Sequence, residues 1–65
     1  MISDKLQPGM LLYDHEPDVS NRGVYPIGAC IFLGVYEERY WILYPTNVSR
    51  SVSEFLINKE MTILE

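Results

Sequence analysis

Residues Ile27 to Tyr44 read IGACIFLGVYEERYWILY, two apolar runs rich in β-forming residues separated by the charged triplet Glu37-Glu38-Arg39. Branched and aromatic side chains suit a pleated surface, and a short charged triplet suits the solvated connection between two paired strands. The stretch therefore predicts a β-hairpin. Its turn lacks the pairs Asn-Gly and Asp-Gly, so the sequence leaves the type of turn open.

Alternation along the first strand of this hairpin separates its side chains into two faces. We expect the face that carries the aliphatic residues to be buried, with Cys30, Phe32 and Tyr36 on the opposite face. Gly34 suits a strongly bent strand, because a missing side chain lets the sheet coil. The expected core contains seven aliphatic residues: Leu12, Ile31, Leu33, Val35, Ile42, Val52 and Ile63.

Shorter strands are expected on either side of the hairpin. Residues 10–13 follow a Pro-Gly turn signal and have the composition of a first strand, whereas residues 14–26 are rich in turn formers and predict a long loop. A weakly alternating strand is expected at residues 50–53. Ser53 is then an N-cap for a single turn of 3₁₀ helix, and residues 61–64 form a final strand.

Five short strands with one long early loop predict an all-β fold, a small barrel formed by a single domain that spans residues 1–65. A chain of 65 residues has room for one small core and little room for a deep pocket. The apolar content of 48% indicates a folded chain. No apolar run approaches the roughly 20 residues that span a bilayer, so no membrane role is expected.

The net charge of −4 and the pI near 4.7 make nucleic acid an unfavourable partner, because phosphate backbones reward clustered Lys and Arg. The five cations are scattered along the chain. Cys30, the only cysteine, cannot form an internal disulfide, and the N-terminal residues lack the apolar segment of an export signal. Both features favour a cytoplasmic location.

Residues 11–16, Leu-Leu-Tyr-Asp-His-Glu, resemble the Ala-Leu-Tyr-Asp-Tyr motif that opens Src-homology-3 domains and leads into their acidic, peptide-contacting loop. Gly28 opens the next strand at about the interval of that family, and Tyr40-Trp41 stands where the family carries paired aromatic residues. The resemblance implies a five-stranded Src-homology-3-like barrel. The closing Pro-x-x-Tyr signature of the family is missing from residues 51–55, so a proline-rich ligand groove would lack part of its wall.

The chain is also similar to the very small barrel proteins of bacteriophages and mobile elements, whose pattern is Leu-x-Pro-Gly-x-Leu-Leu, a loop, a glycine-led apolar strand and an aromatic strand. Here the corresponding segments are residues 6–12, 28–35 and 40–44. This resemblance covers nearly the whole chain. It implies a fold and an accessory role, and no biochemical activity.

The segment Asp14-His15-Glu16-Pro17-Asp18 is the one cluster with the character of a chemical site. Alternate oxygen donors suit a cation, but the glycine and the bidentate glutamate of a calcium loop are absent. A solvated acidic loop is the leading interpretation, and a loop that docks a basic partner is the alternative. Cys30 is expected to be a buried strand residue. No catalytic residue, metal or cofactor is predicted.

Aromatic side chains are too numerous for one small core, so some of them are expected on the surface, where a gathered patch would mark a protein contact. We expect Tyr13, Tyr25 and Trp41 to line a shallow groove beside the acidic loop, with Glu16 and Asp18 placed to pair with a cation of the partner. Extended or proline-bearing peptides suit such a groove. Alternatively, Trp41 is a core residue, because tryptophan is highly buried on average.

These observations predict a non-enzymatic module that binds a protein or peptide, with basic or proline-rich segments among the suitable ligands. The alternative is a nucleic-acid-associated accessory barrel of a transcription or translation assembly, which would need a basic face. A homodimer through an open strand edge or an aromatic patch is a further expectation, since short barrels leave edges unpaired.

Overall fold

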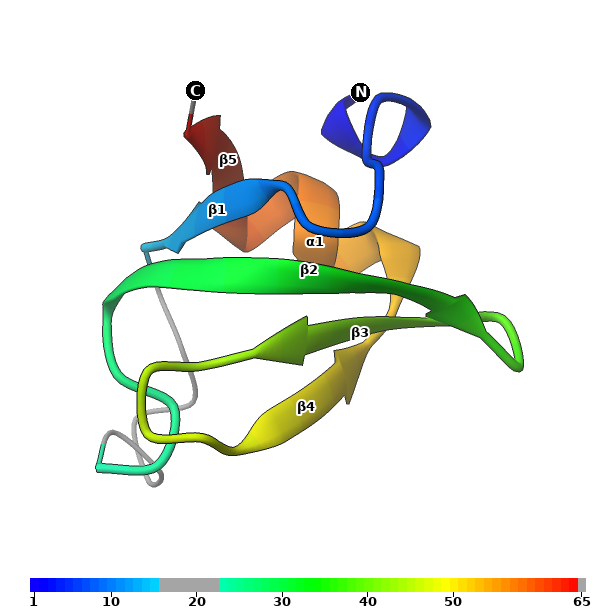
Figure 1. Ribbon diagram of the computed structural model, residues 1–65. Helices are drawn as coiled ribbons and strands as arrows, with labels where there is room; N and C mark the ends of the chain where they lie inside the picture. The colour runs from blue at the N-terminus through cyan, green and yellow to red at the C-terminus, as the bar shows by residue number, and fades with distance from the viewer. Residues whose placement is uncertain (16–22, 65) are drawn as a thin grey trace.

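One antiparallel sheet of five strands forms most of the protein in a computed structural model that describes residues 1–15 and 23–64. The strand order is β4-β3-β2-β1-β5, so β4 and β5 are the edges (Figure 1). This arrangement confirms the prediction of a small, mostly β fold with five strands. The pairings form an open sheet and do not include the closure of a barrel. The strands are β1 (Leu11–Asp14), β2 (Gly28–Tyr36), β3 (Arg39–Leu43), β4 (Ser49–Val52) and β5 (Met61–Leu64).

The predicted hairpin is formed by β2 and β3, which are joined by the two residues Glu37 and Glu38. Both residues have positive φ, 53° and 62°. Positive φ at both central positions is the backbone of a type I′ turn, whose twist matches that of paired strands and which asparagine and glycine usually occupy. Two glutamates therefore hold a conformation that is sterically unfavourable for their side chains.

A β-bulge interrupts the pairing of β2 with β3. Phe32 lies opposite Ile42 and Gly34 lies opposite Trp41, so Leu33 is an extra residue on β2. Gly34 has a φ of 144°, a conformation that side chains of L-residues rarely adopt. The glycine therefore permits the bulge, and the extra residue changes which face each later side chain of β2 occupies.

Two short helical segments accompany the sheet: a 3₁₀ turn, η1 (Ile2–Asp4), and a helix, α1 (Glu54–Glu60). Ser53 caps α1 as expected, because its Oγ accepts a hydrogen bond from the backbone N–H of Leu56 at 3.3 Å. The predicted single 3₁₀ turn is wrong, since α1 is an α-helix of seven residues. The buried side chain of Ile57 anchors its second turn in the core. Within the described part of the chain, neither helical segment is long and apolar enough to cross a membrane.

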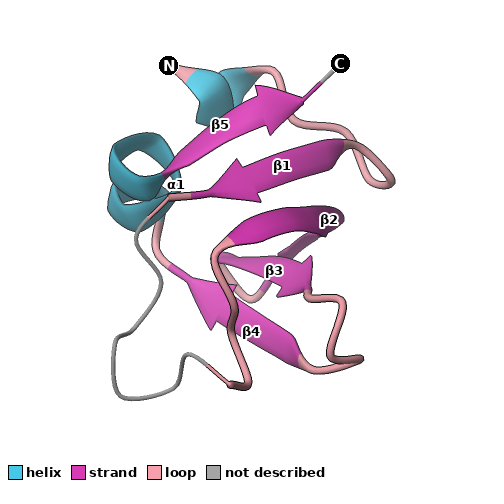
Figure 2. Cartoon of the chain, turned by 90° about the vertical axis from the view of Figure 1, so that its left-hand side faces the viewer, coloured by secondary structure: helices cyan, strands magenta, loops and turns pink. Residues whose placement is uncertain are grey.

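The core lies between the sheet and α1, on one side of the strands (Figure 2). We call this side of the sheet the inner face. The buried hydrophobic residues of the core combine aliphatic, aromatic and sulfur-containing side chains, with Ile2 and Leu6 of the N-terminal segment packed against them. They are Leu12, Cys30, Phe32, Ile42, Tyr44, Val52, Ile57 and Met61.

The predicted core is correct for Leu12, Ile42 and Val52, and Ile63 packs against the core while remaining partly exposed. The prediction is wrong for the residues of β2. Cys30 and Phe32 are buried in place of Ile31 and Val35, which are 38% and 52% exposed, and Leu33 is only half-buried. The large side chain of Phe32 buries more apolar area than an aliphatic side chain would. This gain favours placing the face of β2 that carries Cys30 and Phe32 inside the core.

Candidate functional site

A row of four aliphatic side chains crosses the sheet on the side away from α1. Leu11 on β1 lies directly opposite Leu64 on β5 and Ile31 on β2, and Ile31 lies opposite Leu43 on β3. Directly opposite residues of paired strands present their side chains on the same face. Leu11, Ile31 and Leu64 are 47%, 38% and 37% exposed. The row is therefore a continuous apolar strip at the surface of the sheet.

Further apolar residues extend this strip along β1, β2 and β3. None of the described helices or strands lies over it, in contrast to the inner face (Figure 2). We call this surface the outer face. Its apolar residues are Leu11, Tyr13, Ala29, Ile31, Leu33, Tyr36, Trp41, Leu43 and Leu64, and the register places Ser49, Ser51 and Thr62 on the same side.

A pocket of about 270 Å³ opens on the outer face beside the aliphatic row. Its lining is apolar, and the small side chain of Ala29 takes up little of the space. The lining residues are Leu11, Ala29, Cys30, Ile31, Leu43, Tyr44 and Pro45. Pockets for small molecules are typically about 300–1,000 Å³ and deeply enclosed. At about 270 Å³ this pocket lies just below that range, a size that accommodates a single inserted side chain.

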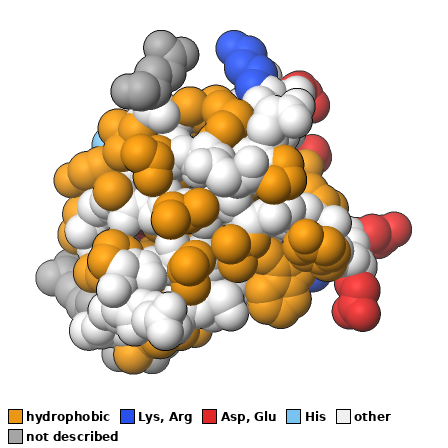
Figure 3. Space-filling view, viewed as in Figure 1, with side chains coloured by type: hydrophobic (Ala, Val, Ile, Leu, Met, Phe, Trp, Pro, Cys, Tyr) orange, Lys and Arg blue, Asp and Glu red, His pale blue; other side chains and the backbone are white. Residues whose placement is uncertain are grey.

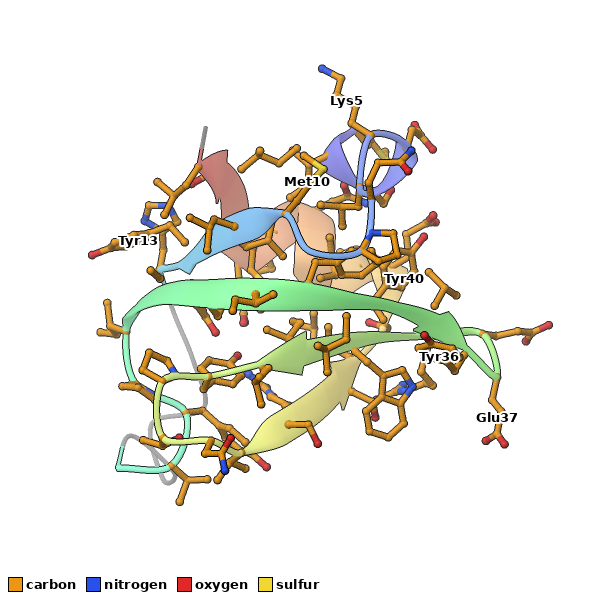
Figure 4. The ribbon with its side chains drawn as sticks, in the orientation of Figure 1. Lys5, Met10, Tyr13, Tyr36, Glu37 and Tyr40 are labelled. Atoms are coloured by element: carbon orange, nitrogen blue, oxygen red, sulfur yellow. The ribbon has the colours of Figure 1, made fainter. Side chains whose placement is uncertain are left out.

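The opposite end of the outer face carries aromatic side chains. The ring of Tyr36 lies over Gly34, where a Cβ atom would come within 3.0 Å of it. Trp41 lies opposite Gly34, and its indole Nε1 donates a hydrogen bond of 3.3 Å to the backbone oxygen of Tyr36. The indole is half-buried, whereas Tyr36 is 60% exposed. The bulge, Gly34 and this hydrogen bond therefore hold the aromatic side chains of Tyr36 and Trp41 at one end of the outer face (Figure 4 labels Tyr36).

Among residues 1–15 and 23–64, charged side chains lie at the edge of the outer face rather than within it. Figure 3 views this surface and shows hydrophobic and neutral atoms across its centre, with blue and red side chains at the periphery. Glu37, at the tip of the hairpin, points away from the sheet (Figure 4). Arg39 lies opposite Tyr36 at one end of the face, and its Nη2 donates to the backbone oxygen of Ser51 at 3.0 Å. An apolar centre with a charged rim is the usual anatomy of a protein interface.

The three aromatic residues predicted to line one groove do not come together. Tyr13 lies opposite Ala29 and Trp41 lies opposite Gly34, five residues further along β2, which separates them by roughly 16 Å along the strand. Both belong to the outer face. Tyr25 instead packs against the core, with its ring centroid 5.3 Å from that of Tyr44. The partner-binding roles of Tyr13 and Trp41 remain predictions, as do those of Glu16 and Asp18, which lie outside the described residues.

Sequence reasoning did not single out the aliphatic row, although the sequence contains a signal for it. Residues 29–35 of β2 are apolar without interruption. Continuous apolar runs are typical of strands whose two faces are both covered, whereas a strand with one solvated face alternates apolar and polar residues. The described helices and strands cover only the inner side of this run, so its composition indicates that another surface covers the other side.

A second cluster, of polar residues, lies at the end of β1. Asp14 is fully buried and accepts a hydrogen bond of 2.6 Å from the hydroxyl of Tyr44. The interpretation as a solvated acidic residue is therefore wrong for Asp14. Nη1 of Arg50 lies 4.0 Å from Oδ2 of Asp14, and the Arg50 guanidinium carbon lies 5.2 Å from the ring centroid of Tyr25. Burial, and then the bond to Asp14, raise the pKa of Tyr44, so its hydroxyl remains a donor at neutral pH.

The other candidates for chemistry have structural roles. Cys30 is buried as expected, and burial raises the pKa of its thiol to about 12, with the charge of Asp14 adding to the shift. A raised pKa is the reverse of what activates a nucleophilic thiol. Nε2 of His15 lies 2.9 Å from Oγ1 of Thr62, and the ring of His15 lies beside that of Tyr13. In residues 1–15 and 23–64, no group of three potential ligands could hold a metal ion.

Comparison with protein-family models, with curated proteins and with solved structures finds no match for this chain.

Proposed function

We propose that this protein is a non-enzymatic interaction module whose contact surface is the outer face of the sheet. The observation that carries the proposal is the aliphatic row of Leu11, Ile31, Leu43 and Leu64 on a sheet face that no described element covers. Contiguous apolar patches on small proteins are costly in water and typically mark binding surfaces. Tyr13 and Trp41 take part in this surface, and Tyr25 does not.

The composition of the outer face supports a protein as the partner. Large aliphatic residues at the centre, aromatic residues toward the ends and charges at the rim match the anatomy of protein interfaces. The pocket beside Ala29 offers a place for one anchoring side chain of a partner, and such anchored side chains often dominate binding energy. The accessory role in a bacteriophage or mobile element, implied by resemblance, remains a prediction.

The rival role of a nucleic-acid-associated barrel has less support. Binding the phosphates of a nucleic acid requires a cluster of Lys and Arg on the contact surface. Among the described residues of the outer face and its ends, Arg39 is the cation that we identify, and it already donates to Ser51. Catalysis also has less support, because the buried thiol of Cys30 has a raised pKa and Asp14 is held by Tyr44 inside the fold.

Photocrosslinking from defined positions tests this proposal. A photoreactive amino acid is placed at Ile31, in the centre of the outer face, and the variant is produced in the cells to which the protein belongs. We expect a discrete crosslinked protein band that an excess of the unmodified chain removes by competition. The crosslinked partner is then identified, whether it is another protein or a second copy of this chain.

Phe55 provides the matched control, because it is also a large apolar residue, is 70% exposed, and lies on α1 away from the outer face. A photoreactive residue at this position should give no specific crosslink. Crosslinks from both positions to the same proteins would indicate non-specific contact and contradict the proposal. Crosslinks from Ile31 to nucleic acid alone would favour the accessory-barrel role instead.

A further inference from the structure

We infer that the partner on the outer face is a second copy of this chain, in a face-to-face dimer. This inference rests on the proposed function, because it names the occupant of the same surface. Three properties of the described residues support it: the size of the face, the distribution of charge around it, and the positions of its pocket and its most exposed aromatic ring.

The size of the molecule limits which occupants can bind stably. The Cα atoms extend over 28 × 26 × 20 Å, so the largest side of the molecule fits within a rectangle of 28 × 26 Å, about 700 Å², and the projected area of the outer face is no larger. Stable interfaces bury about 800 Å² on each partner. A stable complex through the outer face must therefore use nearly all of it. A second copy has the same dimensions and the same apolar composition, so it can cover the face completely, whereas a short peptide would cover only a strip.

The charge distribution removes the main objection to self-association of an acidic chain. With a net charge of −4, two copies repel each other at long range. The charged side chains of the described residues nevertheless lie around the outer face and not at its centre (Figure 3). Pairing two outer faces therefore buries no like charges of residues 1–15 and 23–64 against each other, and the repulsion between their rims is exposed and screened by salt.

The pocket and the most exposed ring of the outer face lie at opposite ends of β2. The pocket includes Ala29, whereas Tyr36 is seven residues further along, a separation of roughly 23 Å. Dimers with a two-fold axis place the same patch of each copy against the other. If the axis lies in the plane of the face and across β2, Tyr36 of one copy is placed over the pocket of the other. Each dimer then has two such contacts.

Analytical ultracentrifugation of the purified chain over a wide concentration range tests this inference. We expect a reversible dimer. Ile31→Glu, which places a charge in the centre of the aliphatic row, should weaken dimerisation at least tenfold. Phe55→Glu adds the same charge to an equally apolar exposed site and should leave dimerisation unchanged. Tyr36→Ala should also weaken the dimer, as should Ala29→Tyr, which fills the pocket. Added salt should strengthen the dimer of the unmodified chain.

Circular dichroism of each variant verifies that it is folded, and Leu11→Glu replaces Ile31→Glu if the latter unfolds. A chain that stays monomeric up to about 1 mM would overturn the inference, because a dimer with a dissociation constant above this concentration is too weak to be a stable complex. A dimer that Phe55→Glu disrupts and Ile31→Glu does not would overturn it as well. A monomeric chain that still crosslinks to a different protein from Ile31 would refute the second copy as partner while leaving the interaction function intact.

Discussion

The two faces of the sheet are built from the same strands and from similar residues, yet they have different surroundings. On the inner face, Leu12, Phe32 and Ile42 are at most 2% exposed, beneath α1 and the N-terminal segment. On the outer face, Leu11 and Ile31 are more than a third exposed, although each is adjacent in sequence to one of those core residues. Apolar composition therefore does not tell which face holds the core. The difference arises from which face the rest of the chain can cover.

The largest expected effect separates the faces directly. Phe32→Ala removes a fully buried ring from the inner face and should lower the free energy of unfolding by about 3–5 kcal/mol, enough to unfold most of a marginally stable domain. Ile31→Ala, one residue away on the outer face, should cost much less because its side chain already contacts water. Urea titration followed by circular dichroism measures both. Equal losses for the two variants would contradict the assignment of the faces.

Removing the buried hydroxyl of Tyr44 should have the next largest effect. Tyr44→Phe keeps the ring on the inner face but takes away the donor 2.6 Å from the buried carboxylate of Asp14. A buried acceptor that loses a partner costs about 1–3 kcal/mol. Urea titration at pH 7 measures the loss. Tyr36→Phe removes a hydroxyl from the exposed outer face and is the control that should leave stability nearly unchanged.

Gly34→Ala tests the bulge that changes the faces of β2. The new Cβ would meet the ring of Tyr36 at 3.0 Å, and a φ of 144° is strained for alanine, so we expect a loss of about 1–3 kcal/mol. Thermal unfolding measures it. In a Tyr36→Ala background the collision disappears but the backbone strain remains, so part of the loss should be recovered. A Gly34→Ala variant as stable as the original chain would argue against the bulge.

At the hairpin tip between β2 and β3, substitution should raise the stability of the fold rather than lower it. Replacing Glu37 with Asn and Glu38 with Gly supplies the residues that tolerate positive φ at both positions and should raise stability by about 1 kcal/mol. The control, Glu37→Gln with Glu38→Gln, removes the charges and keeps the backbone strain. If that control stabilises the fold as much, electrostatic repulsion and not conformation would be the cause.

The last prediction concerns alkaline pH and the inner face, and its effect should be small near pH 9 and grow as the pH rises. The pKa of Cys30 is raised from 9.0 to about 12 in the folded chain, so the unfolded chain loses this proton first as the pH rises. Stability should therefore be fully present below pH 9 and decrease between pH 9 and 12. Thermal melts across this range should show a shallower decrease for Cys30→Val than for the original chain. An unchanged slope would mean that the thiol is more accessible than its burial indicates.

Several parts of the structure follow from local sequence. The strands of the hairpin and the final strand at residues 61–64 were predicted close to their observed bounds, because their β-forming residues lie between clear turn signals. Ser53 was correctly identified as a cap. The length of α1 was not, because its second turn depends on Ile57 entering the core, and tertiary contacts decide this more than helix propensity does.

The candidate site was predictable only in part. A surplus of aromatic residues indicated that some would be exposed, and Tyr13 and Trp41 do lie on the outer face. The expected groove was wrong in its geometry, because the register of β1, β2 and β3 separates these two residues and Tyr25 turns toward Arg50. Register depends on pairing between distant segments, which the local pattern of a single strand does not contain.

The sequence by itself determined that this chain forms a small protein rich in β-strands, since β-branched and aromatic residues, prolines and glycines act on the backbone next to them. It also determined that β2 is apolar on both sides. Only the tertiary structure decided that Phe32 is inside and Ile31 outside, that Asp14 is buried against Tyr44, and that four aliphatic residues form a row. These features depend on a bulge, on strand register and on the position of one short helix, and all three arise from contacts between residues that are distant in the chain.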